Sequence, residues 1–476
     1  MSPDTLKKRD RGLTPVTLRK GNNMKEKTLL IKNCRVVDPA QNIDKVCNVL
    51  VRGGKVAEVT EALPEAEVVI DATGKIVCPG FIDIHTHEDF LDEKTGKLET
   101  NMSESGLHMG VTLRVCGNCG INVMDPVEYL DRIDNEGAAA NVAMMAGHRY
   151  LREMNGGNDK YKPVDGETVE KMKKKAEEYL DKGCLGVSFG VKYIPGTTWA
   201  EITELSGLCR KDGKIVTSHV RNDVDGVFEA AEELARIGKE CGVKVQFSHV
   251  GSMGGYGQME KLLSDIEAFR KDGVDMMCDC YPYNAFSTSI GETTYDDGFL
   301  ESYQADYDSI LIVGGKYAGM RCNEAMFREL RATAPETATV GYFMKAEDVE
   351  RALMSPLVMI GSDGIRQDGQ GHPRASGSFA KFIKEYVASG KISLSEGVAK
   401  VTSMAAERLG LANKGNLKAG SDADIVIFSL DEVRDNATFE NGQLDSQGFS
   451  YVLIGGEVAL KDDKIIDGRL GRSVRR

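Results

Sequence analysis

The chain has 476 residues, 41% hydrophobic and 28% charged, a balance typical of a folded globular protein. Its formal charge of −13 argues against a nucleic-acid binder, because phosphate contacts need basic patches. It contains neither a run of about 18 apolar residues nor an apolar signal core, so neither a membrane span nor secretion is expected. The odd number of cysteines, 11, then favours reduced thiols in a cytoplasmic protein.

Residues 1–23 differ from the rest of the chain. They are rich in lysine and arginine and lack a periodic apolar pattern, so we predict a disordered tail. Met24 precedes a segment with a clear strand pattern and is a candidate for the natural start of the protein. If so, removal of residues 1–23 should leave the activity unchanged.

Short β-rich runs occupy both ends of the remaining chain. Those between residues 28 and 78 are separated by Gly-Gly and Thr-Gly turns, and a matching set lies between 423 and 460. Neither set is long enough to form a stable β domain by itself. Pairing them in space predicts one small β-sandwich domain built from residues 24–79 and 418–476.

Between these ends, strand patterns alternate with helical patterns. Repeated βα units predict a parallel sheet, and eight of them predict a (β/α)8 TIM-type barrel over residues 80–417. The stretch 290–345 is too long for an ordinary loop and is a candidate insertion over the barrel mouth. The expected fold class is therefore α/β. The strand candidates are 81–85, 110–116, 141–146, 184–189, 214–218, 244–248, 274–279 and 356–361.

Histidines and an aspartate follow several of these strands. His85 and His87 are one residue apart after the first strand, so their side chains point to the same face. His219 follows the fifth strand, His249 the sixth and Asp363 the eighth. Because chemistry in such a barrel collects at the carboxyl ends of the strands, we predict that these side chains bind a metal ion.

Imidazole and carboxylate ligands suit Zn²⁺ with one position left open for water. Such an ion lowers the pKa of the water and polarises a scissile carbonyl group. A carboxylate that touches both metal and water can take the proton and pass it to a leaving amine, and Asp363 is the candidate for that catalytic role. The residues thus predict a metal-dependent hydrolase.

Ordered motifs extend this prediction. Pro-Gly-Phe-Ile-Asp-x-His-x-His at 79–87, Ser-His after strands five and six, and Gly-Ser-Asp-Gly at 361–364 resemble the amidohydrolase superfamily, and the resemblance spans residues 28–476. More narrowly, five further segments resemble the D-aminoacylase family, the N-acyl-D-amino-acid deacylases. These segments are 117–120, 188–196, 281–288, 371–374 and 435–440.

The resemblance implies ligand sets and a reaction. His85, His87 and Asp363 would form one metal subsite, while Cys119, His219 and His249 would form the tightly held zinc site. It implies one tight zinc ion with a second left open, and deacylation of an N-acyl-D-amino acid to a carboxylate and a free amine.

Two other residues bear on the metal site. Many amidohydrolases bridge two metals with a carboxylated lysine from strand four, and Lys192 stands just past that strand, so it remains an alternative to Cys119. Cys116 is better explained as a buried small apolar residue.

Substrate residues are also implied. Tyr193, Tyr283 and Ser287 match family positions that face the substrate, and Arg221 and Arg374 are cations near strand ends that could pair with an acid group.

One departure from the family keeps other functions open. Typical D-aminoacylases have a lysine two residues after the strand-six histidine, where this chain has Gly251. The alternatives are a cyclic amidase of the hydantoinase, lactamase or dihydroorotase type, a deaminase, or a non-enzymatic metal-binding protein. The expected partner is a small-molecule amide, without nucleic acid or membrane. Similar enzymes are often dimers or tetramers, which leaves a homo-oligomer open.

Overall fold

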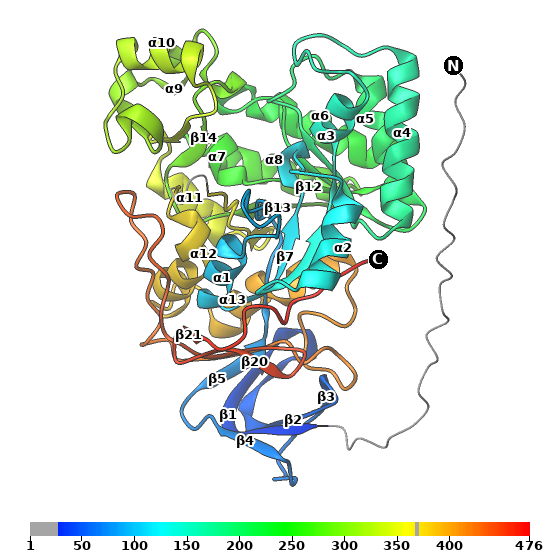
Figure 1. The fold of residues 1–476 in the computed structure, drawn as a ribbon, viewed down its shortest axis with the longest axis vertical. Coiled ribbons are helices and arrows are strands. Elements are labelled where there is room, and N and C mark those ends of the chain that lie inside the picture. Colours follow the sequence, from blue (N-terminus) through cyan, green and yellow to red (C-terminus); the bar gives the residue numbers. More distant parts are fainter. Residues whose placement is uncertain (1–26, 367–370) are drawn as a thin grey trace, which may run out of the picture.

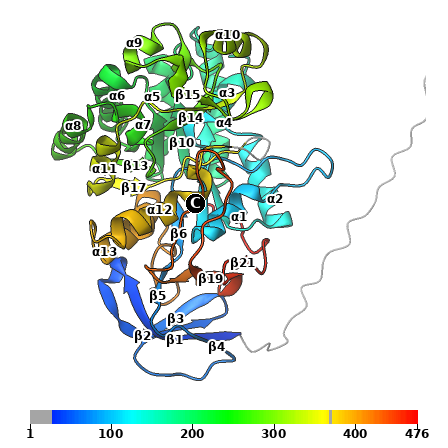
Figure 2. The same ribbon diagram turned by 90° about the vertical axis from the view of Figure 1, so that its left-hand side faces the viewer.

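The computed structural model describes residues 27–366 and 371–476, so the segment 1–23, expected to be disordered, lies outside the described residues. Strands from both ends of the chain pair in one sheet, seen at the bottom of Figure 1 and again in Figure 2. Its order is β21-β20-β19-β18-β5-β1-β2-β3, with β4 beside β1. The strands are β1 (Thr28–Asp38), β2 (Ile43–Arg52), β3 (Lys55–Thr60), β4 (Val68–Asp71), β5 (Ile76–Pro79), β18 (Ile425–Phe428), β19 (Phe449–Ile454), β20 (Glu457–Lys461) and β21 (Lys464–Ile465).

The two chain ends are joined where β18 runs antiparallel to β5, with Ile425 opposite Pro79. Alternate residues of these strands point to one face, and Ile31, Ile425 and Ile427 lie in one buried apolar cluster. Burial of this shared face stabilises the sheet, because neither end of the chain supplies enough apolar surface by itself.

The middle of the chain forms parallel strands. They pair in the order β6-β7-β8 in one sheet and β9-β10-β11-β12-β13-β17 in the other, and Met145 alone separates β8 from β9. Buried, largely apolar strands such as β7 are typical of a parallel sheet that is covered on both faces. The strands are β6 (Phe81–Asp83), β7 (Val111–Cys116), β8 (Asn141–Met144), β9 (Ala146–Gly147), β10 (Gly186–Gly190), β11 (Ile215–His219), β12 (Lys244–Phe247), β13 (Met276–Cys280) and β17 (Val358–Ile360).

Contacts also connect the segments that follow β6 and β17. Thr86 forms a parallel bridge with Gly364, and the Asp363 N–H donates to the carbonyl of His85 at 2.7 Å. The Asp83 carboxylate accepts from the Ser362 N–H at 2.9 Å. The strand that precedes the two histidines is thereby fixed beside the strand that precedes Asp363.

Amphipathic helices alternate with the parallel strands. In α6, Val227, Ala230, Leu234 and Ile237 are buried at helical spacing. A capping box between Thr198 and Glu201 begins α5. The helices are α1 (Asn101–His108), α2 (Pro126–Glu136), α3 (His148–Met154), α4 (Gly166–Asp181), α5 (Trp199–Gly207), α6 (Val227–Cys241), α7 (Val250–Gly254), α8 (Met259–Lys271), α9 (Phe299–Tyr303), α10 (Glu324–Thr333), α11 (Ala346–Met354), α12 (Arg374–Phe382), α13 (Leu394–Val401) and α14 (Ser403–Leu409).

The segment between β13 and β17 adds a separate small sheet. Its strands β14 (Phe286–Ser289), β15 (Ile310–Ile312) and β16 (Ala338–Gly341) pair antiparallel in the order β14-β16-β15. Figures 1 and 2 place α9 and α10 of this segment at the opposite end of the molecule from β1–β4. Within residues 27–366 and 371–476, every helix is too short or too polar to span a bilayer.

Candidate metal centre and substrate cavity

The segment after β6 carries His85 and His87, both buried. The fully buried Arg114 on the neighbouring strand β7 fixes this segment, because its guanidinium donates to the carbonyl of His87 at 2.6 Å. The same guanidinium pairs with Asp89 at 2.6 Å. A buried arginine with both partners satisfied leaves the histidine pair little freedom to move.

Cys119 lies in a tight turn after β7. Its backbone is left-handed, with φ of 54°, and the Asn118 side chain braces the turn by donating to the carbonyl of Val115 at 2.9 Å and accepting from Thr217 at 3.1 Å. Gly120 is required here, since a Cβ at this position would lie 2.9 Å from the backbone nitrogen of Gly190. The turn thus places the thiol against the end of the parallel strands.

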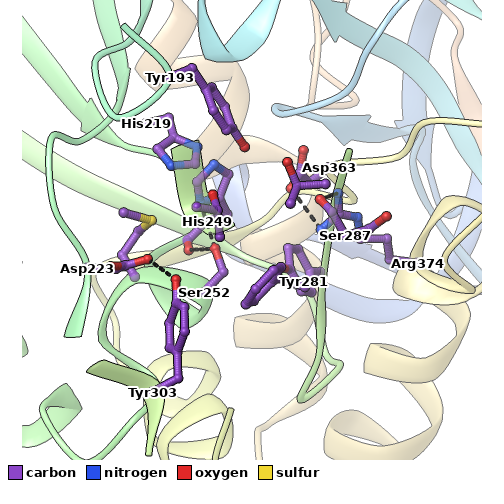
Figure 3. Close-up of a pocket in the computed structure, with 14 residues that line it drawn as sticks. Tyr193, His219, Asp223, His249, Ser252, Tyr281, Ser287, Tyr303, Asp363 and Arg374 are labelled. Carbon is purple, nitrogen blue, oxygen red and sulfur yellow. Dashed lines mark hydrogen bonds and ion pairs between the residues drawn. The ribbon is translucent and has the colours of Figure 1, made fainter. Parts of the chain in front are cut away.

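His219 ends β11, His249 follows β12, and Asp363 follows β17. His249 and Asp363 also have left-handed backbones, with φ of 35° and 49°. Non-glycine residues in this region carry strain, which is concentrated at functional sites. The three side chains face the same cavity in Figure 3.

One group of donor atoms consists of Cys119, His219 and His249, whose atoms lie within 4.8 Å of one another. Nε2 of His249 is 3.4 Å from the Cys119 sulfur, and Nδ1 of His219 is 3.9 Å from it. All three side chains are buried. Two imidazoles and a thiolate are ligands that zinc accepts.

A second group shares the same sulfur. His85, His87, Cys119 and Asp363 also bring their donor atoms within 4.8 Å of one another. Nε2 of His85 is 3.4 Å from the sulfur, and Nε2 of His87 is 3.1 Å from an Asp363 oxygen. Cys119 therefore stands between two groups of side chains, each of which could bind a cation.

The charges in the cluster favour a cation. Burial opposes ionisation of the Cys119 thiol, but His85 and His249 outweigh it and hold the pKa well below its ordinary range. Burial likewise opposes ionisation of Asp363, but Arg374 above all keeps the pKa of that carboxyl low. A thiolate and a carboxylate, the ionised forms, are the forms in which these groups bind a divalent metal.

Two residues that the sequence did not single out position the histidines. An Asp279 oxygen lies 3.1 Å from Nδ1 of His85, and this carboxylate also accepts from the His249 N–H at 2.8 Å. The Ser252 hydroxyl lies 2.9 Å from Nδ1 of His249. In both rings Nδ1 faces a side-chain oxygen, and Nε2 faces the Cys119 sulfur. The position of Asp279 in β13, beside the other strand ends, was the signal that could have identified it.

Two cavities adjoin the cluster. The smaller encloses about 310 Å³ and reaches from His219, His249 and Asp363 to Asp223 and Tyr303. The larger encloses about 710 Å³ beside His87 and Cys119. Five residues line both: Tyr193, Ser287, Thr288, Asp363 and Arg374.

Three of the predicted substrate residues therefore line the cavities. The centroid of the Tyr193 ring lies 4.4 Å from that of the His219 ring, and the two rings are tilted by 53°. Arg374 pairs with Asp363 at 2.9 Å, and the Ser287 hydroxyl donates to the carbonyl of Thr339 at 2.8 Å. Tyr281, which the sequence placed only within a motif, also lines the smaller cavity and has a buried hydroxyl without a partner among the described residues.

The structure places the other predicted residues elsewhere. Arg221 pairs with Glu233 at 2.8 Å and lines a separate surface hollow. The Tyr283 hydroxyl is directed against Gly377, outside the lining of both cavities. Lys192, the candidate bridging ligand, pairs with Asp223 at 2.7 Å and lines neither cavity.

Comparison with known proteins agrees with this chemistry. The model of the Amidohydrolase family matches residues 322–460. The N-acyl-D-glutamate deacylase of Alcaligenes xylosoxydans xylosoxydans is 30% identical, over 91% of this chain and 94% of the relative. The D-aminoacylase of the same organism is 31% identical, over 94% of this chain and 97% of the relative.

Solved structures agree as well. The N-acyl-D-glutamate deacylase from Bordetella bronchiseptica, complexed with zinc and a phosphonate inhibitor, is similar with a TM-score of 0.84 and 28% identity, over 95% of this chain and all of that one (100%). A D-hydantoinase structure, 18% identical with a TM-score of 0.63, covering 94% of this chain and 99% of its own, shares the fold alone. The fold is thus the α/β fold of the amidohydrolase type, and the chain belongs to the amidohydrolase family, among the D-aminoacylases.

Proposed function

We propose that this protein is a zinc-dependent hydrolase that cleaves the amide C–N bond of an N-acyl-D-amino acid and releases a carboxylate and the free D-amino acid. The main support is the pair of donor groups that share Cys119 at the edge of a cavity. Relatives that match over nine-tenths of their length are named for this reaction class.

The ligand assignment is part of the proposal. Cys119, His219 and His249 would bind the tight zinc ion, because a soft thiolate with two imidazoles is a strong zinc set. His85, His87 and Asp363 would bind a second ion beside it. When bound, zinc polarises the scissile carbonyl and lowers the pKa of water.

The chain's own residues would bind the substrate and move the proton. Among the described residues, Arg374 places a guanidinium in the lining of both cavities, so it pairs with the substrate carboxylate, assisted by the nearby Ser287. Tyr193, beside His219, faces the place where the carbonyl oxygen gains charge and can donate to it. Asp363 accepts the proton of the attacking water and passes it to the departing nitrogen.

We also propose that the two parallel sheets close into one (β/α)8 barrel over residues 80–417 and that the terminal sheet is a separate domain of residues 24–79 and 418–476. Support comes from the single residue between β8 and β9 and from the bridge between Thr86 and Gly364. Residues of 290–345 contribute Tyr303 and Glu292 to the cavity linings, as an insertion over the mouth would.

A cyclic amidase is the second candidate. It is favoured by Gly251, whose lack of a side chain removes the charge that a D-aminoacylase places there. A panel of N-acetyl-D-amino acids, their L enantiomers, hydantoins and lactams separates the two, with the zinc-loaded protein as catalyst. We expect turnover of N-acetyl-D-amino acids and little of the L forms. Turnover confined to hydantoins or lactams would replace the proposal with the cyclic amidase.

A further inference from the structure

We infer that the Asp223 end of the smaller cavity selects substrates whose side chain carries an uncharged hydrogen-bond donor, such as a carboxamide, and rejects a side-chain carboxylate. The inference rests on the proposed function and names the substrate class of the same site. It follows from the partners of Asp223, the charge balance of the lining, and the place of the cavity beside the metal ligands.

Asp223 is fixed on both oxygens. One accepts from the Lys192 ammonium at 2.7 Å, and the other accepts from the hydroxyl of Tyr303 on α9. The next residue, Val224, has a left-handed backbone with φ of 50°, an uncommon state for a β-branched residue. Strain of this kind persists only where the surroundings impose it, so the carboxylate is held in one position.

The geometry presents a hydrogen-bond acceptor to the cavity, and the charge of this acceptor is neutralised. Asp223 and Tyr303 line the cavity but Lys192 does not, so the ammonium neutralises the carboxylate from behind. A carboxylate offers about four acceptor positions, and the two neighbours fill one on each oxygen. The remaining positions can accept an N–H. A substrate cation gains little, because Lys192 repels it. A substrate carboxylate would face Asp223, which is an acceptor and offers it no hydrogen bond.

No free cation is available to a second acidic group in the described lining of either cavity. Arg374 already pairs with Asp363 at 2.9 Å and is needed for the carboxylate of the amino acid itself. A side chain at Gly251 is excluded, since its Cβ would lie 2.7 Å from the Cys280 sulfur. Glu292, which lines the larger cavity, is a further acid.

The arrangement of the two cavities indicates which part of the substrate each cavity would hold. Figure 3 shows Asp223 and Tyr303 on one side of the histidines, and Arg374 with Ser287 on the other. The larger cavity is lined by Ile121, Ala338 and Ile365, which suits the acyl group. The smaller cavity then receives the amino-acid side chain, whose end reaches Asp223.

This preference differs from that of named relatives. The chain matches an N-acyl-D-glutamate deacylase and an N-acyl-D-aspartate deacylase at 30% and 29% identity. Both names specify an acidic side chain. Glutamine has nearly the shape of glutamate but adds a donor and removes the charge, so this pair of substrates isolates the contribution of Asp223.

The test compares kcat/KM of the zinc-loaded full-length protein for N-acetyl-D-glutamine, N-acetyl-D-glutamate and N-acetyl-D-methionine. We expect glutamine to exceed glutamate by about tenfold or more, as a site that pairs a donor rejects an analogue lacking it. Asp223→Asn, which can donate as well as accept, should lower the glutamine-to-glutamate ratio by about tenfold with little change for methionine. Asp225→Asn, on the same loop but bonded to Gln258, is the matched control and should leave the ratio unchanged.

Lys192→Met provides a second variant should Asp223→Asn fold poorly. It leaves the carboxylate without its neutralising partner, so discrimination against glutamate should increase. Equal rates for glutamine and glutamate, or a ratio unaffected by Asp223→Asn, would overturn the inference and leave the proposed function intact. Absence of turnover with all three substrates, in protein that binds zinc, would overturn the proposed function and the inference with it.

Discussion

Arg374 Nη1 lies 2.9 Å from one oxygen of Asp363, while the other oxygen lies 3.1 Å from Nε2 of His87. Both partners favour the ionised carboxylate, and together they outweigh the burial that opposes it, so the pKa of Asp363 lies well below its ordinary range. The carboxylate is therefore ionised at neutral pH, at the edge of both cavities.

Replacing this carboxylate tests its catalytic role. Asp363→Ala should lower kcat by about 10³-fold, within the range expected for loss of a general base. Zinc bound by Cys119, His219 and His249 should remain, because Asp363 belongs to the other donor group. Steady-state kinetics and metal analysis of the same sample measure kcat and the bound zinc. Asp297→Ala, at an exposed position, is the control. Near-normal turnover would remove Asp363 from the mechanism.

The thiol ligand can be tested against its two rivals. Cys119→Ser should greatly weaken zinc binding, because the sulfur lies in both donor groups. Cys116→Ser, three residues earlier, replaces a thiol that donates to the carbonyl of His87, and this variant should retain the metal. Lys192→Met should also retain it, since Lys192 pairs with Asp223. Metal loss in Lys192→Met but not in Cys119→Ser would favour the carboxylated lysine.

The contacts of Asp279 with His85 and His249 should strengthen zinc binding, and this effect can be measured. Asp279→Asn keeps the shape of the side chain but removes the charge that faces His85 and weakens the acceptor of the His249 N–H. Zinc affinity should fall about 10- to 100-fold, as for other partners of metal-binding histidines. Competition with a chelator of known affinity measures the change, with the exposed Asp272→Asn as the control. An unchanged affinity would show that Asp279 does not support the site.

Zinc binding should depend on pH through His87. Burial opposes its protonation, but Asp363 and Cys119 outweigh burial and raise the pKa of His87 to about 9 from an ordinary 6.5. The proton stabilises the metal-free fold fully below about pH 6.5, and this contribution is lost as the pH rises through about 9. Because a ligand imidazole must be neutral, zinc displaces that proton, and affinity should increase with pH across this window.

Titration of the metal-free protein with zinc in a calorimeter, in buffers of different ionisation enthalpy, gives the number of protons released on binding. We expect more protons released at about pH 7 than at about pH 9.5. An equal count at both would contradict the raised pKa of His87. The His87→Asn variant should release fewer protons at the lower pH.

The last residues of the chain are predicted to stabilise the parallel strands. The Gly471 N–H donates to Ala138 and the Val474 N–H to Val142, each at 2.7 Å. The buried Lys214 ammonium donates to a backbone oxygen of Arg476. Removal of residues 470–476 should lower the free energy of unfolding by about 2 kcal/mol or more, since several buried bonds are lost at about 1 kcal/mol each.

Denaturant unfolding at fixed zinc concentration measures this loss. Asp134→Asn removes the ion pair with Arg475 and weakens the bonds that Asp134 accepts from Ser473, and it should cost less than about 1 kcal/mol. A truncated protein as stable as the full chain would show that these contacts contribute little.

The sequence by itself determined the strand pattern and the donor set. His85, His87, His219, His249 and Asp363 were identifiable because each follows a short apolar run, and strand ends of a parallel sheet lie together. Cys119 came from a motif, since a cysteine in a turn has no periodicity to reveal it. Residue type and position after a strand are both local features of the sequence. Ligands defined by these two features can therefore be recognised without the structure.

Tertiary structure alone decided which polar residues line the two cavities. Arg221 and Arg374 are both cations near strand ends, but Glu233 holds the first outside the cavities, whereas the second reaches Asp363. Asp223 and Tyr303 meet across 80 residues of chain. Such partners depend on how the loops that follow different parallel strands cross one another. Side-chain direction there is set by packing between distant segments and leaves no pattern in the sequence.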